Sequence, residues 1–307
     1  MKRVSIVVPA HNESENLITL VTQLSDQQSR LNGWDMHIII VDDGSQDDTV
    51  QIIKTLHKTY SVELIRLSQN FGHQNALLAG LKRADGDAVI MMDADLQHPP
   101  EKIPEMILAY ENGAHIVQMV RDRQVCGLNG ILSTLFYKLF KKVTGIELIE
   151  QGADFRLLSR YVVNLIHQIP EREIFFRALL PTLGFKIHCI QYLQPNRLKG
   201  ISSYTLRKSF QLANKALFNY STFPLKFISY LGLSLAMLSF IVGISFVVIK
   251  LIHGDSIVPG FTDIIVSIYF LSGCILGAIG ILGHYLMLIL NQVRGRPKYV
   301  VAPQNYD

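Results

Sequence analysis

Short apolar runs alternate with amphipathic segments along the first hundred residues of the chain. Four runs rich in Val and Ile predict strands, and the three segments between them have the spacing of amphipathic helices. Strand, helix and strand in steps of about 30 residues predict right-handed βαβ units and a mostly parallel sheet. Because the strands are continuously apolar, we expect helices on both faces of this α/β sheet. The predicted strands are Val4–Val8, His37–Val41, Val62–Leu67 and Asp87–Met92, and the predicted helices are Glu15–Leu24, Asp48–Tyr60 and Gln74–Arg83.

Two long apolar stretches follow nearer the C-terminus, at residues 227–252 and 264–290. Each exceeds the roughly 20 residues that cross a bilayer core, and Lys250 is their only Asp, Glu, Lys or Arg. They predict two membrane-spanning helices; buried core helices are the alternative, although globular helices seldom stay apolar on every face. Lys and Arg flank the pair but are absent from the loop 253–263, so both termini are expected in the cytoplasm and this loop outside. The flanking residues are Lys215, Lys226, Arg294, Arg296 and Lys298.

These patterns divide the chain into four expected parts. They are a cytoplasmic α/β domain (1–205), a juxtamembrane amphipathic helix (206–226), two membrane helices with a short external loop (227–290) and a cytoplasmic tail (291–307). The segment Ile131–Val143 also predicts an amphipathic helix, either solvated on one face or lying on the membrane surface.

Composition and charge agree with a membrane protein that faces the cytoplasm. Of the 307 residues, 49% are hydrophobic and 18% are charged, and the net charge of +4 suits membrane lipids better than nucleic acid. Cys126, Cys189 and Cys274 lie far apart without metal-site spacing, as expected in a reducing compartment. The apolar run after Lys2 and Arg3 is too short for a cleavable signal peptide.

Polar clusters follow three of the predicted strands and should meet at one edge of the sheet. Asp93 and Asp95 point the same way in extended backbone and repel each other unless a cation lies between them. They therefore predict a Mg²⁺ or Mn²⁺ site, with Gln97 adding an amide oxygen or orienting a metal-bound water. The alternative is a capped turn there, and a βα turn with a helix N-cap after the second strand. The clusters are Pro9-Ala10-His11-Asn12-Glu13, Asp42-Asp43-Gly44-Ser45 and Asp93-Ala94-Asp95.

Four ordered motifs resemble the family-2 glycosyltransferases of GT-A fold: VSIVVPAHNESENL (4–17), VDDGSQDDT (41–49), LSQNFGHQNALLAG (67–80) and DGDAVIMMDADLQHPPE (85–101). With the apolar stretches and the ending RGRPKYV (294–300), nearly all of residues 1–300 are similar to polyprenyl-phosphate glycosyltransferases, such as bactoprenol glucosyltransferases and dolichyl-phosphate mannose synthases. The resemblance implies a GT-A Rossmann-like sheet followed by a transmembrane hairpin. It also implies inverting transfer of one hexose, best matched by glucose from UDP-glucose, to undecaprenyl phosphate at the cytoplasmic face of the bacterial inner membrane.

The resemblance implies roles for individual residues on the donor side. Asp95, Asp154 and Arg197 form the implied catalytic set, in which Asp154 orients the sugar and Arg197 contacts the diphosphate. A strand edge with a satisfied ion pair is the alternative for the segment Asp154-Phe155-Arg156. His11 stands where Tyr or Phe is commoner. The implied nucleotide- and sugar-binding residues are Pro9, His11, Glu13, Asp42 or Asp43, Asp93 and Arg197, and the implied metal-binding residues are Asp93, Asp95 and Gln97.

On the acceptor side, Arg121, Arg123 and Ser133 would hold the lipid phosphate, although Asn129 replaces a second expected arginine. A solvated loop is the alternative for the two arginines. Ser203 stands where the family usually has a lysine, which Lys199 or Arg207 would replace. His284, where many relatives have Glu, would be a packing residue or a contact in a homo-oligomer formed through membrane helices.

Other donors and other functions are the alternatives to this interpretation. The same motifs accompany N-acetylglucosamine, galactose, mannose (from GDP-mannose) and aminoarabinose donors. A processive polysaccharide synthase carries a Gln-x-x-Arg-Trp motif, whereas the one tryptophan here is Trp34, far upstream. A non-catalytic membrane scaffold is disfavoured because Asp93 and Asp95 are both present.

Overall fold

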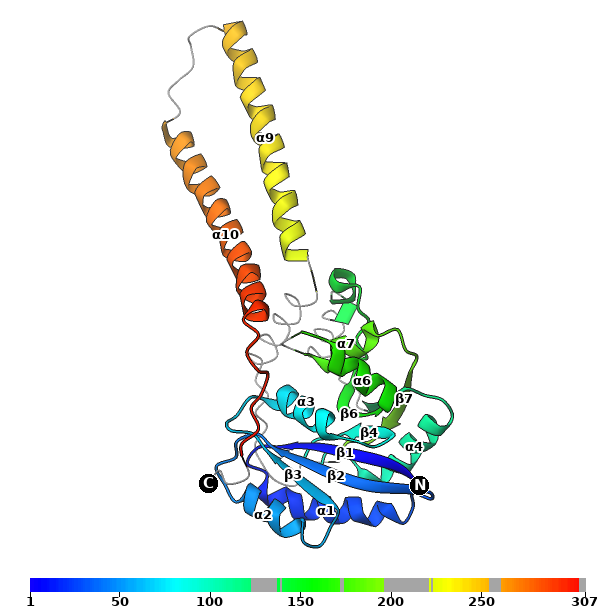
Figure 1. The fold of residues 1–307 in the computed structure, drawn as a ribbon. Coiled ribbons are helices and arrows are strands. Elements are labelled where there is room, and N and C mark those ends of the chain that lie inside the picture. Colours follow the sequence, from blue (N-terminus) through cyan, green and yellow to red (C-terminus); the bar gives the residue numbers. More distant parts are fainter. Residues whose placement is uncertain are drawn as a thin grey trace. The chain divides into compact units, whose positions relative to one another are not determined.

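In the computed structural model, the apolar runs of the N-terminal region form four adjacent strands, β1 to β4, of a seven-stranded sheet with the order β3-β2-β1-β4-β6-β5-β7 (Figure 1). All neighbouring strands run parallel except β6, which is antiparallel to both β4 and β5. This confirms the predicted mostly parallel sheet. The strands are β1 (Lys2–Ala10), β2 (Trp34–Asp42), β3 (Val62–Arg66), β4 (Ala88–Met91), β5 (Ile116–Arg121), β6 (Gly152–Ser159) and β7 (Ile187–Tyr192).

The structure describes residues 1–122, 137–138, 140–171, 174–195, 221, 223–253 and 261–303. The chain divides into two compact units, one made of Met1–Thr205 with Arg296–Asp307 and the other of Leu206–Gly295. The second unit is therefore inserted into the chain of the first.

Helices cover both faces of the sheet because the strands are apolar on both sides. Adjacent residues of β1 show this, since Ile6 belongs to the core on one face and Val7 to the core on the other. The first core is closed by α1 (Ser14–Gln28), α2 (Thr49–Leu56) and α4 (Ile103–Glu111), which follows the short helix η1 (Pro100–Lys102). The second core is closed by α3 (His73–Arg83), α6 (Arg160–Gln168) and α7 (Phe176–Thr182).

The order of the strands determines where a ligand would bind. From β1 the chain moves outward to β2 and β3, and then returns to place β4 on the other side of β1. In open α/β sheets, the crevice beyond the carboxyl ends of the strands at such a reversal is the usual ligand site. The polar residues that follow β1 and β4 flank this point.

The second unit contains two long helices, α9 (Phe223–His253) and α10 (Phe261–Val293). Over the described residues, one segment, Phe270–Val293 in α10, is long and apolar enough to cross a membrane, with a mean hydropathy of 2.1. The corresponding apolar stretch of α9, Phe223–Leu235, is shorter. The first of the two predicted spans therefore stays a prediction. Near the chain entry to α9, the Tyr285 hydroxyl donates to the Ser221 carbonyl at 2.8 Å.

After α10 the chain returns to the first unit through residues 296–303, which we call the C-terminal segment. Val301 forms an antiparallel bridge with Leu67, directly after β3. The Ser68 amide donates to the Val300 carbonyl at 2.9 Å, and the Ala302 amide donates to the Arg66 carbonyl at 2.8 Å. The segment thus extends the β3 edge of the sheet.

Candidate active site

The polar residues after β1 and β2 are joined by short hydrogen bonds. The Asp43 amide donates to the Ala10 carbonyl at 2.8 Å, the Asn12 amide to Ser45 Oγ at 2.9 Å, and the Gln46 amide to Asn12 Oδ1 at 2.8 Å. Two of the three predicted clusters therefore form one connected surface at the carboxyl edge of the sheet.

His11 is held in place within this surface by its ring nitrogens. Its Nδ1 lies 2.9 Å from the Asp43 carbonyl oxygen, which only accepts hydrogen bonds, so Nδ1 carries the proton. Nε2 then accepts from the side-chain amides of Asn12 at 3.3 Å and Asn70 at 3.2 Å. Because both ring nitrogens are hydrogen-bonded, the orientation of the imidazole ring is fixed. A fixed ring plane favours stacking on a base or ribose.

The acidic pair at the end of β2, Asp42 and Asp43, is almost completely buried. Asp43 accepts from the amides of Phe71 at 2.7 Å and Gly72 at 3.0 Å, so both of its oxygens hold the loop before α3. Asp42 accepts from the Ser45 amide at 3.1 Å and faces Arg66 at 4.0 Å. These contacts give both carboxylates a role in shaping the loops, while their contact with a nucleoside stays a prediction.

Two further predicted donor-side residues lie at the same edge. Pro9 is paired with Val41 near the end of β1. Glu13 precedes α1, and its carboxylate accepts from the Asn16 side chain at 2.7 Å.

Asp93 and Asp95 follow β4 and flank Ala94, which is buried in the first core. Asp93 Oδ1 is buried without a hydrogen-bond partner among the described residues. Such an orphaned carboxylate oxygen is costly unless something binds it, and a hard divalent cation is suited to do so. The two carboxylates therefore fit a Mg²⁺ or Mn²⁺ ion. The described residues form no group of three His, Cys, Asp or Glu side chains that could hold a metal, so substrate oxygens would supply the other ligands.

Backbone geometry distinguishes this edge of the sheet. Among the described residues, three non-glycine positions have positive φ: Asn12 (57°), Leu96 (62°) and Gln151 (57°). Asn12 follows β1, Leu96 separates Asp95 from Gln97, and Gln151 precedes β6, which carries Asp154. Left-handed backbone costs a non-glycine residue about 1–2 kcal/mol, and such positions concentrate at functional sites.

Two histidines that were not assigned from the sequence lie beside Asp93. His73, the first residue of α3, has its Nε2 3.5 Å from Asp93 Oδ1. His98 has its Nε2 3.6 Å from Asp93 Oδ2, and its buried ring stacks on Phe155 with centroids 5.1 Å apart. Burial lowers the pKa of His98, although the charges of Asp93 and Asp95 oppose this effect, and the ring is neutral.

Asp154 lies between two arginines. Its Oδ1 accepts from Arg156 at 2.6 Å, and its Oδ2 accepts from Arg177, on α7, at 3.1 Å. Burial alone would raise the pKa of the Asp154 carboxyl, but Arg177 and Arg156 outweigh it and hold this pKa well below its ordinary value. Burial also lowers the pKa of Arg156 to about 10, so this side chain remains charged at neutral pH. Asp154 is thus an ionised anchor and a poor proton acceptor.

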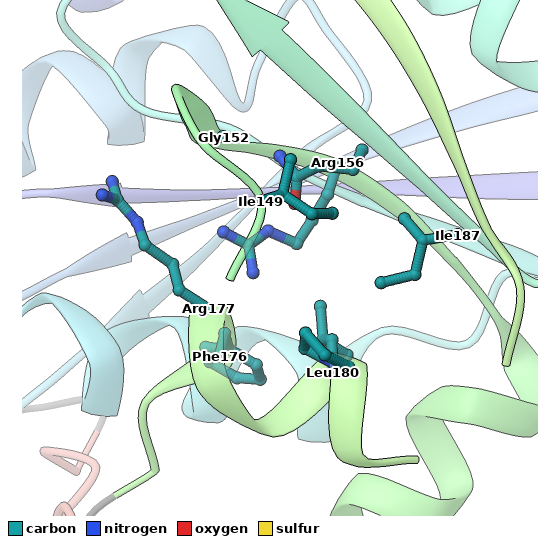
Figure 2. A pocket seen from close by; sticks show the side chains of 9 residues that line it. Ile149, Gly152, Arg156, Phe176, Arg177, Leu180 and Ile187 are labelled. Atoms are coloured by element: carbon teal, nitrogen blue, oxygen red, sulfur yellow. The ribbon is translucent and has the colours of Figure 1, made fainter. Parts of the chain in front are cut away.

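The Arg156 side chain also lines a small pocket between β5, β6, β7 and α7, where Figure 2 shows it reaching from its strand toward the helix. Its Nε and Nη1 are buried without hydrogen-bond partners among the described residues. Arg177 also lines this pocket and was not predicted from the sequence. A charged residue inside the otherwise apolar helical run FFRALL was the available signal. The pocket is lined by Gln118, Ile149, Gly152, Arg156, Phe176, Arg177, Leu180, Pro181 and Ile187.

The other predicted site residues fall into two groups. Gln97 is placed beside Asp95, but its amide oxygen accepts from Gln194 at 2.8 Å. Arg121 ends β5, opposite Tyr192 of β7. His284 lies in α10. Outside the described residues lie Arg123, Ser133 and Arg197, together with Lys199, Ser203 and Arg207.

The known proteins to which this chain is similar are named as glycosyl or glucosyl transferases. The model of the family described as glycosyl transferase family 2 matches residues 5–166. The chain is 37% identical over 302 residues to the SfII prophage-derived bactoprenol glucosyl transferase of Shigella flexneri, covering 97% of each chain. It is 35% identical over 302 residues to the prophage bactoprenol glucosyl transferase homolog of Escherichia coli (strain K12), covering 97% of this chain and 98% of the other.

The fold has solved counterparts as well. Glucosyl-3-phosphoglycerate synthase from Mycobacterium tuberculosis, in complex with Mn²⁺, UDP and phosphoglyceric acid, matches with a TM-score of 0.54 and 17% identity. The match covers 71% of this chain and 76% of that one, and it supports the fold.

Proposed function

The chain belongs to glycosyl transferase family 2, and from that membership we propose that it transfers one glucose from UDP-glucose to undecaprenyl phosphate. The observation that carries the proposal is the 37% identity, over 97% of both chains, to a protein named bactoprenol glucosyl transferase. The product is a polyprenyl-phosphate-linked sugar for cell-envelope glycosylation.

The reaction needs no strong base from the protein. An oxygen of the lipid phosphate forms a bond to the anomeric carbon, the bond from that carbon to the UDP oxygen breaks, and UDP leaves with the electron pair. The second pKa of a phosphate monoester is about 6, so the nucleophile is already ionised at neutral pH. This agrees with Asp154, whose lowered pKa suits an orienting role better than proton abstraction.

The chain's main task is then to bind the donor and to stabilise negative charge. Asp93 and Asp95 would hold a Mg²⁺ or Mn²⁺ ion, whose charge offsets that of the departing diphosphate when it is bound. The neighbour complexed with Mn²⁺ and UDP supports this assignment. Arg197 would contact the diphosphate. Arg121, with Arg123 and Ser133, would bind the acceptor phosphate.

A lipid acceptor also requires the enzyme to work at a bilayer. We assign α9 and α10 as a multi-pass membrane anchor, with the catalytic unit and both termini in the cytoplasm. The apolar segment Phe270–Val293 supports a span in α10, and the charges flanking the pair support the orientation.

The test uses the full-length protein in detergent with undecaprenyl phosphate and a panel of radiolabelled sugar nucleotides. UDP-glucose with Mn²⁺ should yield a labelled lipid, and excess chelator should abolish it. Asp93→Ala and Asp95→Ala should each lower kcat by about 10²–10³-fold, the loss typical of removing charge stabilisation in a transition state.

Asp85→Ala is the matched control, since Asp85 lies before β4, at the opposite end of the strand, and pairs with Arg3 at 2.8 Å. It should retain wild-type activity. A lipid product from a different donor would correct the sugar, whereas no lipid product from any donor would overturn the proposal. Full activity in chelator would contradict the metal assignment.

A further inference from the structure

His98 and Asp93 are connected at two points. The Asp93 backbone amide donates to His98 Nδ1 at 2.9 Å, and His98 Nε2 lies 3.6 Å from Asp93 Oδ2. The histidine is completely buried, and its ring is wedged against Phe155, with Tyr192 at its edge at a centroid distance of 6.3 Å. The ring therefore has little freedom to turn.

The backbone contact fixes the tautomer of this ring. An amide N–H can only donate, so Nδ1 must be the unprotonated nitrogen, and the proton of the neutral ring is on Nε2. His98 thus directs a buried N–H toward the Asp93 carboxylate. Within the described residues, this Nε2 has no hydrogen-bond partner at ordinary distance.

The Asp93 carboxylate and the His98 ring therefore each have one buried polar atom without a hydrogen-bond partner among the described residues. Asp93 Oδ1 is buried without a hydrogen-bond partner, and His98 Nε2 lies near Oδ2 of the same group. A small rotation of the carboxylate would bring Oδ2 onto Nε2 and would fix the direction of Oδ1. His73, which lies 3.5 Å from Oδ1 and is 40% exposed, has room to move toward solvent as a cation arrives.

We propose that His98 is a positioning residue that holds Asp93 Oδ2 through Nε2–H and so aims Oδ1 at the divalent cation. The proposal rests on the proposed function, because that function supplies the cation. Partners that orient a metal-binding side chain in this way typically change metal affinity by about 10–100-fold when they are removed.

Two substitutions separate this role from mere packing. His98→Asn keeps an acceptor near the position of Nδ1 and loses the donor near Oδ2. His98→Gln places an amide nitrogen near the position of Nε2 and loses the acceptor for the backbone amide. Both lose the ring that stacks on Phe155, so the loss of stacking is matched between them.

The experiment measures Mn²⁺ affinity by electron paramagnetic resonance of free Mn²⁺, using full-length protein in detergent with saturating UDP. His98→Asn should bind Mn²⁺ about 10–100-fold more weakly than the wild type, whereas His98→Gln should stay within a few-fold of it. Fluorescence of the single tryptophan, Trp34, which is buried in the catalytic unit, verifies that each variant is folded.

The outcomes distinguish this inference from the function on which it rests. If the wild type binds Mn²⁺ and folded His98→Asn binds it equally well, the role of His98 is wrong and the metal assignment stands. If the wild type binds no Mn²⁺ with UDP present, both are wrong. Should His98→Asn fail to fold, His98→Gln decides alone, and a loss of more than tenfold in that variant overturns the proposal.

Discussion

The carboxylate of Asp154 contacts two guanidinium groups, those of Arg156 and Arg177. Arg156 is fully buried, and its contact with Asp154 is the shorter of the two. Burying an ion pair is seldom strongly stabilising, but removing one partner leaves the other as an uncompensated charge. The Asp154 cluster is therefore a place where a nearly isosteric substitution has a large effect.

Asp154→Asn should lower the free energy of unfolding by about 3–5 kcal/mol, because it leaves the Arg156 charge buried without a counter-charge. Denaturant titration followed by Trp34 fluorescence measures it, since this one tryptophan lies in the catalytic unit. Asp35→Asn, which breaks the exposed contact with Arg3, is the control and should behave like the wild type. Equal stability of the two variants would contradict the assignment.

The wild type and Asp154→Asn should also differ in how their stability depends on pH. The folded-state pKa of Asp154 lies below its value in an unfolded chain, which is about 3.9. Ionised Asp154 thus stabilises the fold above about pH 4, and this contribution is lost as the pH falls further. Between about pH 5 and pH 3 the wild type should lose stability more steeply than Asp154→Asn. Parallel profiles would contradict this.

At the scale of elements, α3 packs against the sheet through a glycine. A Cβ at Gly80 would lie 2.2 Å from Val7 Cγ1 and 3.1 Å from Val41 Cγ2. The helix therefore approaches β1 and β2 more closely than any other residue at position 80 would allow. Because α3 begins at His73, this packing also places the N-terminal end of the helix beside Asp93.

Gly80→Ala should destabilise the catalytic unit by about 1–3 kcal/mol through overpacking, even though alanine alone favours a helix by about 1 kcal/mol. The thermal or denaturant midpoint reported by Trp34 measures the change. Adding Val7→Ala removes the methyl group that clashes with the new Cβ. The double variant should therefore lose less stability than the sum of the losses in the two single variants. Strictly additive losses would argue against a close contact between α3 and β1 at this position.

The elements differ in how well the sequence predicts them. The strands β1, β2 and β4 contain runs of Val and Ile, or of Val, Ile and Met, and together with β3 each lies within a few residues of its predicted range. In contrast, β7 has only two buried residues, Ile190 and Tyr192, and β6 carries Asp154 and Arg156 inside a strand, so neither has a clear apolar pattern. The predicted helix 48–60 ends at Leu56, since the chain turns there to enter β3.

The residues of the candidate site also differ in how well the sequence predicts them. Asp93 and Asp95 were identifiable because they end an apolar strand two residues apart. His98 was not, since its role depends on a turn with left-handed backbone at Leu96 that returns position 98 to Asp93. Arg177 lies 23 residues beyond Asp154. The spacing of apolar residues along a strand or a helix does not predict a contact between side chains so far apart in the sequence.

At the scale of the whole molecule, the unit of Leu206–Gly295 is an insertion, and the C-terminal segment belongs to the first unit. The bond from the Ala302 amide to the Arg66 carbonyl joins this segment to the end of β3. Arg66 faces Asp42, and the following residues lead to the loop whose amides bind Asp43. The C-terminal segment therefore adjoins the strand end and the loop that contact Asp42 and Asp43.

Ala302→Pro should lower the stability of the catalytic unit by about 1–3 kcal/mol, because proline removes the amide donor and leaves the Arg66 carbonyl without it. Ala302→Ser keeps the amide and a similar size, and it should remain close to the wild type. Unfolding followed at Trp34 compares the two. A proline variant as stable as the serine variant would show that the C-terminal segment does not stabilise the unit.

The unit made of Leu206–Gly295 is inserted between two parts of the first unit. The chain departs near Thr205 and returns near Arg296, and both ends belong to the same folded body. Because both stretches are needed to build one folded body, the first unit is complete only after residues 206–295 have been synthesised.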